Sequence, residues 1–572
     1  MKTIIPIIIS SFLAYHLHAQ NDVIAIDDIH IYVDTEKSLV LINKDTDTLN
    51  TLYTGEKNQI ELAGQLYAFT SIISELEIGK AYEITNTANE NFVLYFTQLP
   101  IVHILTSNTI VDEPRVAAQF TWCESNSNHV ESAIGIEYSG GWTQTLPKKS
   151  FRIEFWENEV GSKTKNISFL GMRKDDDWNL QAMYNEPLRL RGKANFELWR
   201  QIDTLHYQME EPEAVNGVRQ EYVELFLNNS YRGVYAIGER PDRKQFKLKK
   251  YKDREIRGEL YKGVNWGEIT TYASLPSYDN DSEFWGGMEY KYPDEIVEWN
   301  NIYAFFDFIL QEDSLDFYDQ YAEKFDIDNA INYFIFMNLL RAYDNTGKNL
   351  FIAKYDADDP YFYIPWDLDG TFGIWWNGTK ESNTKGILTN GFYERLLQDE
   401  DFTERLVSRW NSLRKGVLTL DNIMEGFKVH FDYLNSNAVY DREVMAWQSN
   451  DLFDFKNLDY TSTWLNDRLN YLDNAFENPE SLKQLEEEEV EQVETIVYPN
   501  PATNQLKIVP SDNAAIRRIQ ISNSLGQVLQ VYAETDLTAD IDISNLADGI
   551  YFIDIATTDG KRTTKEIIVK RK

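Results

Sequence analysis

Three kinds of residue or motif are scarce in this chain of 572 residues. The single cysteine, Cys123, excludes an internal disulfide framework. Only seven histidines occur, none in an H-E-x-x-H or paired Cys/His spacing, so we expect no protein-held zinc site. Positive charge is also low, because 55 Lys and Arg face 92 Asp and Glu and give a formal net charge of -37. Since such a surface repels polyanions, we expect no nucleic-acid partner.

Long apolar runs are also missing. The longest runs from Ile4 to Tyr15, shorter than the roughly 20 residues of a membrane span, and is followed by Leu17, His18 and the small Ala19. This pattern is typical of a signal peptide at residues 1–19. The alternative is a membrane anchor, which the short run disfavours. We therefore expect an exported mature protein without a transmembrane segment.

The common nucleotide and hydrolase motifs are absent as well. The sequence has no Walker lysine loop, no G-x-G-x-x-G after a strand and no G-x-S-x-G elbow. The side chains left for chemistry are carboxylates, amides and lysines.

The pattern along the chain predicts a multidomain α+β protein. Short alternating stretches predict a small β domain at 20–100, and mixed strands and helices predict one large unit at 101–476. Within it, Asp326 is placed to cap a helix that is apolar around nearly its whole circumference and ends near Asp344. Residues 477–495, with the run Glu486 to Glu489, read as a solvated acidic linker.

Evenly spaced short strands predict a separate immunoglobulin-like β-sandwich at 496–572. This segment resembles the C-terminal sorting domain of type IX secretion substrates in Bacteroidetes, through "YPNP" at 498–501, "NSLGQV" at 523–528, "LADGIY" at 546–551 and the basic tail 570–572. An immunoglobulin-like binding module is the alternative with the same fold. The resemblance implies interaction with the type IX secretion machinery and passage across the outer membrane, often with removal of this domain and attachment at the cell surface.

One acidic constellation follows the buried helix. Asp344 is followed five residues later by Asn349, and Asp367 and Asp369 come after two aromatic strands. This is the order in which protein kinases assemble a phosphoryl-transfer site. A carboxylate can orient a hydroxyl nucleophile and accept its proton, while Mg²⁺ prefers carboxylate and amide oxygens. The alternative reading is a set of acidic surface turns.

Two other stretches support the first reading. Lys148 and Lys149 begin an amphipathic strand, where an ammonium group can reach phosphate oxygens. Glu239 and Asp242 follow another strand and can pair with that lysine or help to hold metal. The alternative is that the lysines are exposed residues that protect a strand edge and the carboxylates are solvated turn residues.

Five ordered phrases between Pro147 and Gly373 resemble the CotH family of spore-coat and secreted atypical kinases: "PKKSFRIEF", "YNEPLRLRGKANFELWRQI", "VELFLNNSYRGVYAIGERPD", "DNTGKNLF" and "IPWDLDGTFG". The resemblance implies a distant kinase-like fold that binds ATP with Mg²⁺ or Mn²⁺ and phosphorylates protein serine. The expected partner is therefore a protein substrate, such as a co-secreted or surface protein.

Position by position, the resemblance implies roles for single residues. It implies a catalytic role for Asp344, metal binding by Asn349, Asp367 and Asp369, and cofactor binding by Lys148 or Lys149, Arg191 and Glu239. Glu186 stands where the family phrase has Asp, and residues 258–282 lack the polar phrase expected there.

Trp366, beside the metal loop, can stack on adenine or pack in the core, and packing is the favoured interpretation. Two other function classes stay open. One is a non-catalytic surface protein that uses a kinase-like fold for structure or adhesion. The other is a carbohydrate-active enzyme with two carboxylates, for which no acid and base pair stands out.

Overall fold

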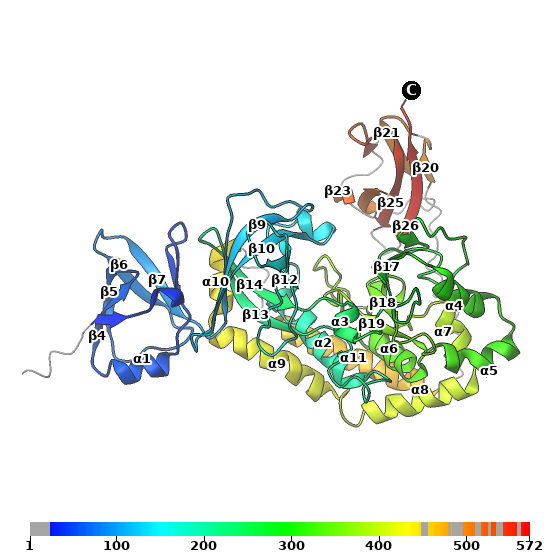
Figure 1. Ribbon diagram of the computed structural model, residues 1–572, viewed down its shortest axis with the longest axis horizontal. Coiled ribbons are helices and arrows are strands. Elements are labelled where there is room, and N and C mark those ends of the chain that lie inside the picture. The colour runs from blue at the N-terminus through cyan, green and yellow to red at the C-terminus, as the bar shows by residue number, and fades with distance from the viewer. Residues whose placement is uncertain are drawn as a thin grey trace, which may run out of the picture.

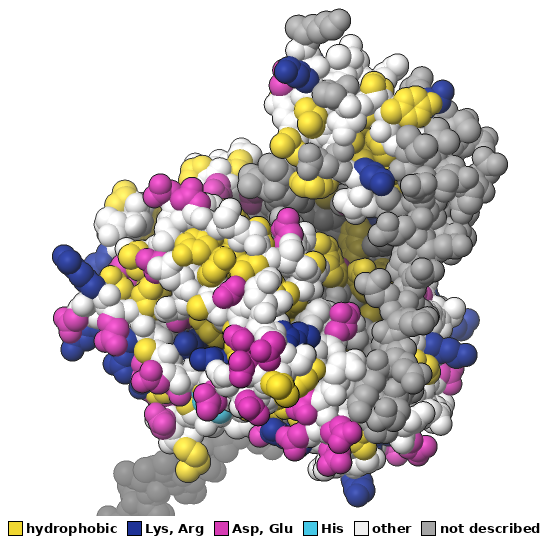
Figure 2. All heavy atoms as spheres, turned by 90° about the vertical axis from the view of Figure 1, so that its right-hand side faces the viewer, with side chains coloured by type: hydrophobic (Ala, Val, Ile, Leu, Met, Phe, Trp, Pro, Cys, Tyr) yellow, Lys and Arg dark blue, Asp and Glu magenta, His cyan; other side chains and the backbone are white. Residues whose placement is uncertain are grey.

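The computed structural model describes residues 23–447, 456–478, 482, 496–500, 502–509, 516–523, 528–533, 541–557 and 562–571. The predicted signal peptide and nearly all of the predicted acidic linker lie outside these residues. Helices and several β-sheets are mixed along the chain, so the protein is α+β (Figure 1). None of the helices in the described ranges has the length and apolar character to cross a bilayer. Figure 2 shows Asp and Glu side chains scattered over one face, with Lys and Arg between them.

A seven-stranded sheet forms the N-terminal part, in the order β1-β4-β5-β6-β7-β3-β2. The sequence predicted only strands here, but the structure adds a short helix, α1 (Thr46–Leu52), whose first amides bond to the Asp45 side chain. The strands are β1 (Val23–Ala25), β2 (Ile31–Asp34), β3 (Leu39–Ile42), β4 (Lys57–Leu62), β5 (Gln65–Ile73), β6 (Tyr82–Asn86) and β7 (Asn91–Phe96), with a 3-10 turn η1 (Asp28–His30).

A closed barrel follows, in the order β10-β11-β12-β14-β13-β8-β9. Along β11 buried Phe151, Ile153 and Phe155 alternate with half-buried polar residues, so the strand fills the barrel core with one face. The sequence patterns predicted two of these strands, β11 and β13, but not the closure of the barrel. The elements are β8 (Ile101–Leu105), β9 (Val116–Cys123), β10 (His129–Ser139), η2 (Trp142–Thr145), β11 (Ser150–Trp156), β12 (Asp177–Gln181), β13 (Gln220–Leu227) and β14 (Ser230–Gly238). Between β12 and β13 the chain forms η3 (Pro187–Arg189) and helix α2 (Arg191–Ile202).

The next unit is a five-stranded sheet with the order β16-β17-β15-β18-β19. Helix α6 (Ile327–Leu340) packs on its edge strand, and every residue of α6 except Asp328 is buried. The Asp326 carboxylate accepts a hydrogen bond from the Asn329 amide, which confirms the predicted cap. The remaining elements are α3 (Arg243–Phe246), β15 (Glu259–Gly263), β16 (Phe284–Trp285), β17 (Met288–Tyr292), α4 (Asn300–Gln311), α5 (Ser314–Lys324), η4 (Tyr343–Thr346), β18 (Leu350–Lys354) and β19 (Tyr361–Pro365).

Five helices complete the central region: α7 (Gly391–Leu396), α8 (Glu400–Leu413), α9 (Leu420–Ser436), α10 (Val439–Trp447) and α11 (Lys456–Glu477). Helices α8 and α9 lie along the lower side in Figure 1, while α10 packs against β14 of the barrel. Helix α10 therefore joins the helical region to the barrel.

The C-terminal part is a sandwich of two small sheets, β20-β21-β24 and β23-β22-β25-β26. Its described strands agree with the predicted evenly spaced pattern. They are β20 (Ile496–Tyr498), β21 (Gln505–Val509), β22 (Ile516–Asn523), β23 (Val528–Ala533), β24 (Ile541–Asp542), β25 (Gly549–Thr557) and β26 (Arg562–Val569).

Candidate active site

The site forms at one end of the β18–β19 pair. The two strands are antiparallel with Leu350 opposite Pro365, so the residues just before β18 and just after β19 are neighbours. The Trp366 amide donates to the Asn349 carbonyl at 3.0 Å, and the Asn349 amide donates to the Gly263 carbonyl at 3.0 Å. Sheet register therefore places Asn349 beside the segment that carries Asp367 and Asp369, although they are about twenty residues apart in sequence.

Asn345 connects the turn that carries Asp344 to this strand end. Its buried side-chain amide donates to the carbonyl oxygens of Asn349 at 2.6 Å and Trp366 at 2.8 Å. Asp344 precedes Asn345 on η4, so the amide holds the Asp344 turn against both flanks of the site. Sequence reasoning did not single out Asn345, although it lies inside the quoted phrase "DNTGKNLF".

The structure brings Asp344, Asn349, Asp367 and Asp369 together. Desolvation by the surrounding protein raises the pKa of Asp367, and the Asp344 carboxylate raises it further. Desolvation raises the pKa of Asp369 still more strongly, and repulsion from Asp367 and Asp344 adds to the rise. Solvent nevertheless reaches the Asp367 side chain, although the surrounding protein atoms desolvate its carboxylate. A cation bound here would relieve this repulsion.

Two lysines that sequence reasoning missed lie next to these carboxylates. Lys348 Nζ is 3.2 Å from Asp344 Oδ2, and Lys262 on β15 acts electrostatically on Asp367. Lys262 has no carboxylate within ion-pair distance among the described residues, and its ammonium lies 5.9 Å from the Phe351 ring centre and 6.0 Å from that of Trp366. Burial lowers the pKa of Lys262, against the opposing effect of Glu289. Lys262 belongs to β15 (Glu259–Gly263), so residues 258–282 begin with a strand.

The predicted lysine pair has other partners. Lys148 is fully buried, and its ammonium donates to Glu443 Oε1 at 2.7 Å and to the Val234 carbonyl at 2.6 Å. Burial lowers the pKa of Lys148 to about 7, against the opposing effect of Glu443. Lys149 donates to the Gln144 carbonyl at 2.5 Å. Neither lysine is among the charged groups that act on Asp367, so their role with phosphate stays a prediction.

Arg191 and Glu186 form a buried ion pair behind Asp369. Arg191 Nη1 lies 2.7 Å from Glu186 Oε1, and Nη2 donates to Thr461 Oγ1 at 2.9 Å. The Glu186 carboxylate raises the pKa of Asp369, while Asp369 opposes the burial that lowers the pKa of Arg191. Arg191 therefore lies near the acidic residues, with both ends of its guanidinium already bonded to protein.

Glu239 is buried and bonds to arginine and glutamine side chains and to a backbone amide, and not to Lys148 or Lys149. Its carboxylate accepts from Arg219 Nη2 at 2.6 Å, from the Arg173 amide at 2.9 Å and from Gln245 Nε2 at 3.0 Å. These bonds outweigh desolvation, the largest single influence, and lower the pKa of Glu239. Protein donors thus bond to both carboxylate oxygens of Glu239. Its role in cofactor binding stays a prediction.

Trp366 packs against core aromatic residues, which is the interpretation that the sequence favoured. It is half-buried, with ring centres 6.3 Å from Phe196 and 6.2 Å from Phe351. The tryptophan therefore supports the strand end that leads to Asp367.

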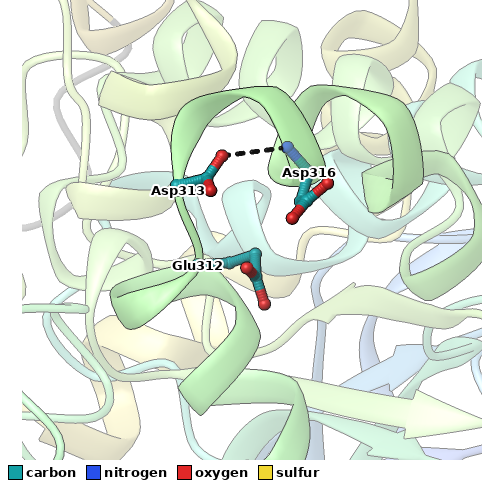
Figure 3. A group of neighbouring side chains, drawn as sticks. All are labelled: Glu312, Asp313 and Asp316. Carbon is teal, nitrogen blue, oxygen red and sulfur yellow. Dashed lines mark hydrogen bonds between the residues drawn. The ribbon is translucent and has the colours of Figure 1, made fainter.

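One other carboxylate group stands out among the described residues. Oxygens of Glu312, Asp313 and Asp316 lie within 4.8 Å of one another on the turn between α4 and α5 (Figure 3). Asp313 accepts hydrogen bonds from the amides of Leu315 and Asp316 at 2.9 and 3.2 Å, which is an ordinary helix cap. All three residues are exposed, so we assign no site to them.

Comparison with known proteins identifies the family of the central region. Residues 136–477, more than half of the chain, match the family model described as CotH kinase protein. The chain belongs to the CotH family. Within this CotH family member, residues 496–570 match the secretion system C-terminal sorting domain. Both predicted resemblances are thereby confirmed, and the sorting domain marks the chain for secretion and for attachment at the cell surface.

A curated relative is the inner spore coat protein H of Bacillus subtilis (strain 168). It is 21% identical over 243 residues, a stretch that covers 42% of this chain and 59% of the relative. The match thus spans less than two thirds of the relative's length.

Proposed function

We propose that this protein transfers the γ-phosphoryl group of ATP to a serine or threonine hydroxyl of a protein, with Mg²⁺ or Mn²⁺ as the metal. The observation that carries the proposal is the convergence of Asp344, Asn349 and Asp367 at one end of β18 and β19. Membership of the CotH family supports the same reaction class.

The donor set fits a hard divalent cation. Asn349 offers an amide oxygen, Asp367 a recessed carboxylate, and Asp369 a second carboxylate whose charge is costly without a cation. A divalent cation held by these residues would supply neutralisation of phosphate charge during transfer. Asn349 and Asp367 have left-handed backbones, with φ of 55° each, and such strained positions are common at functional sites.

Asp344 would orient the acceptor hydroxyl and accept its proton. Its side chain is 25% exposed and ion-paired with Lys348, so an acceptor can reach it from solvent. In the transfer, the hydroxyl oxygen forms a bond to the γ-phosphorus, the bond from that phosphorus to the β-bridging oxygen breaks, and ADP leaves.

Lys262 is a better placed phosphate partner than Lys148 or Lys149. An ammonium that acts on Asp367 and has no ion pair within the described part of the chain can bind phosphate oxygens without breaking a salt bridge there. Lys148 would first have to leave a buried bond to Glu443, which is costly.

The test uses the mature protein, residues 20–572, with labelled ATP, Mg²⁺ or Mn²⁺ and co-secreted proteins as acceptors. Asp344→Asn should reduce phosphoryl transfer by roughly 10²- to 10⁴-fold. Asp358→Asn, an exposed aspartate at the opposite end of the β18–β19 hairpin, is the matched control and should leave transfer unchanged. Absence of transfer to any acceptor, together with no change in melting temperature on adding ATP and metal, would favour the non-catalytic surface protein.

A further inference from the structure

A short hairpin follows the turn that carries Asp367 and Asp369. Ile374 and Lys380 form a bridge, the Trp375 amide donates to the Thr379 carbonyl at 2.9 Å, and the Gly378 amide donates to the Trp375 carbonyl at 2.8 Å. Residues 374–380 are called the Trp376 hairpin below.

The Trp376 hairpin contacts the residue after Asp369 and a residue of the Glu186 segment. A Cβ placed on Gly370, directly after Asp369, would lie 3.0 Å from the Trp376 amide nitrogen, so the two backbones are in close contact. On the other side, Asn185 Nδ2 donates to the Trp376 carbonyl at 3.0 Å. Asn185 directly precedes Glu186, whose carboxylate acts on Asp369. The hairpin is therefore joined to the acidic turn by close backbone approach at Gly370 and to the Glu186 segment by the Asn185 side chain.

The sorting domain reaches this hairpin. The Arg518 guanidinium on β22 lies over the Trp376 ring, 4.7 Å from its centre, and both side chains are half-buried. The contact joins residues 142 positions apart, on two regions that match two different families. Figure 1 shows the sandwich standing beside the β17 and β18 region of the central sheet.

Charge favours the same contact. Residues 496–572 contain nine Lys and Arg and nine Asp and Glu, so the formal charge of -37 is carried by residues 1–495. An arginine from a domain with no net formal charge is therefore presented to an acidic partner, and stacking on tryptophan is the strongest form of cation–π contact. Because the two domains share one chain, their effective concentration is high and a weak contact can still be populated.

We propose that the Trp376 hairpin is a docking surface for the chain's own sorting domain, and that docking restrains the turn of Asp367 and Asp369 and lowers phosphoryl transfer until the sorting domain is detached. The second half rests on the proposed function. The first half concerns only contact and mobility.

The docking half is tested by hydrogen exchange on the mature protein, residues 20–572. Arg518→Ala should speed exchange of the Trp375 and Gly378 amides several-fold, and cleavage at a protease site engineered between residues 483 and 495 should do the same. Lys565→Ala is the matched control, since Lys565 is an exposed cation on the neighbouring part of the same sandwich. If Arg518→Ala and Lys565→Ala give the same exchange as the wild type, docking is overturned.

The restraint half is tested on the same samples with labelled ATP. Arg518→Ala and the cleaved protein should transfer phosphate at least several-fold faster than wild type and Lys565→Ala. Faster exchange with an unchanged transfer rate overturns the restraint and leaves docking supported. Faster exchange with no transfer by any sample supports docking and counts against the proposed kinase activity, so the two failures are distinguishable.

Discussion

The Lys262 ammonium lies 6.0 Å from the centre of the Trp366 ring, and Trp366 is the residue directly before Asp367. The ring that packs at the end of β19 is thus also the ring that lies next to the Lys262 ammonium. The ammonium lies over the ring face and acts on Asp367, with no carboxylate at ion-pair distance among the described residues. This relationship adds a second positive charge to a site where Lys348 already pairs with Asp344.

Replacing Lys262 by Met should weaken ATP binding. The apolar stem is kept, so the melting temperature should change little, while KM for ATP rises about tenfold or more because one charged contact to phosphate is lost. Steady-state kinetics and thermal unfolding check this together. Lys354→Met, a lysine on β18 that also lies over an aromatic ring, at 4.7 Å from Tyr361, is the control and should keep KM. An unchanged KM in Lys262→Met would contradict a phosphate role.

Removing the charge of Asp369 should stabilise the metal-free protein. Its carboxylate is desolvated and repelled by Asp367, Asp344 and Glu186, so Asp369→Asn should raise the free energy of unfolding by about 1 kcal/mol. The increase in melting temperature on adding Mg²⁺ or Mn²⁺ should become smaller in the same variant. Asp358→Asn should change neither quantity. A variant that is less stable than wild type and keeps the full metal response would argue against mutual repulsion at a metal site.

Lys148 and Lys149 should respond differently to substitution by Met. Lys148→Met leaves Glu443 buried with only Arg189, at 3.0 Å, as a cationic partner, and should cost about 3 kcal/mol of stability. Lys149→Met loses a hydrogen bond to one carbonyl and should cost less than about 1 kcal/mol. Denaturant unfolding measures both. If Lys148→Met is as stable as wild type but raises KM for ATP, the resemblance-based phosphate role is correct.

The contact between α2 and α9 should weaken in acid. Glu197 accepts from His430 Nε2 at 2.6 Å and pairs with Lys193 at 2.9 Å; these partners outweigh desolvation and lower the pKa of Glu197 to about 2 from an ordinary 4.5. Because the folded pKa is the lower one, the stabilisation is fully present above about pH 4.5 and is lost as the pH falls towards 2.

Glu197→Gln should therefore cost about 1–2 kcal/mol at pH 7, discounted for partial solvent exposure, and clearly less at pH 3. Urea unfolding at pH 7, 5 and 3 gives the comparison. Glu425→Gln, an exposed residue on α9, should differ from wild type by the same small amount at each pH. A Glu197→Gln cost that is constant from pH 7 to pH 3 would show that the carboxylate charge is not the stabilising feature.

Local patterns accounted for several elements and for part of the site. The cap at Asp326 and the apolar circumference of the following helix depend on residues within one or two turns, so they can be read from adjacent positions. The group of Asp344, Asn349 and Asp367 could also be predicted, because a tight hairpin lies between Asn349 and Asp367 and a hairpin brings its two ends together.

The partners of the lysines could not be predicted in this way. Lys148 meets Glu443 across 295 residues, through packing of α10 on the barrel, and no pattern around either residue indicates the other. Lys262 reaches the site because β15 pairs with β18, with Lys262 opposite Phe351. A one-residue change of that register would turn the lysine to the other face of the sheet.

The sequence by itself determined the acidic character of the protein, its order of domains, its CotH and sorting-domain membership and the identity of the convergent carboxylates. Only the tertiary structure decided which ammonium lies beside Asp367, which carboxylates are fully bonded to protein, and that Arg518 stacks on Trp376. The physical reason is the separation along the chain between the residues that interact. Periodicity and capping act between residues a few positions apart, whereas the surroundings of a charge depend on strand register and helix packing between segments hundreds of residues apart.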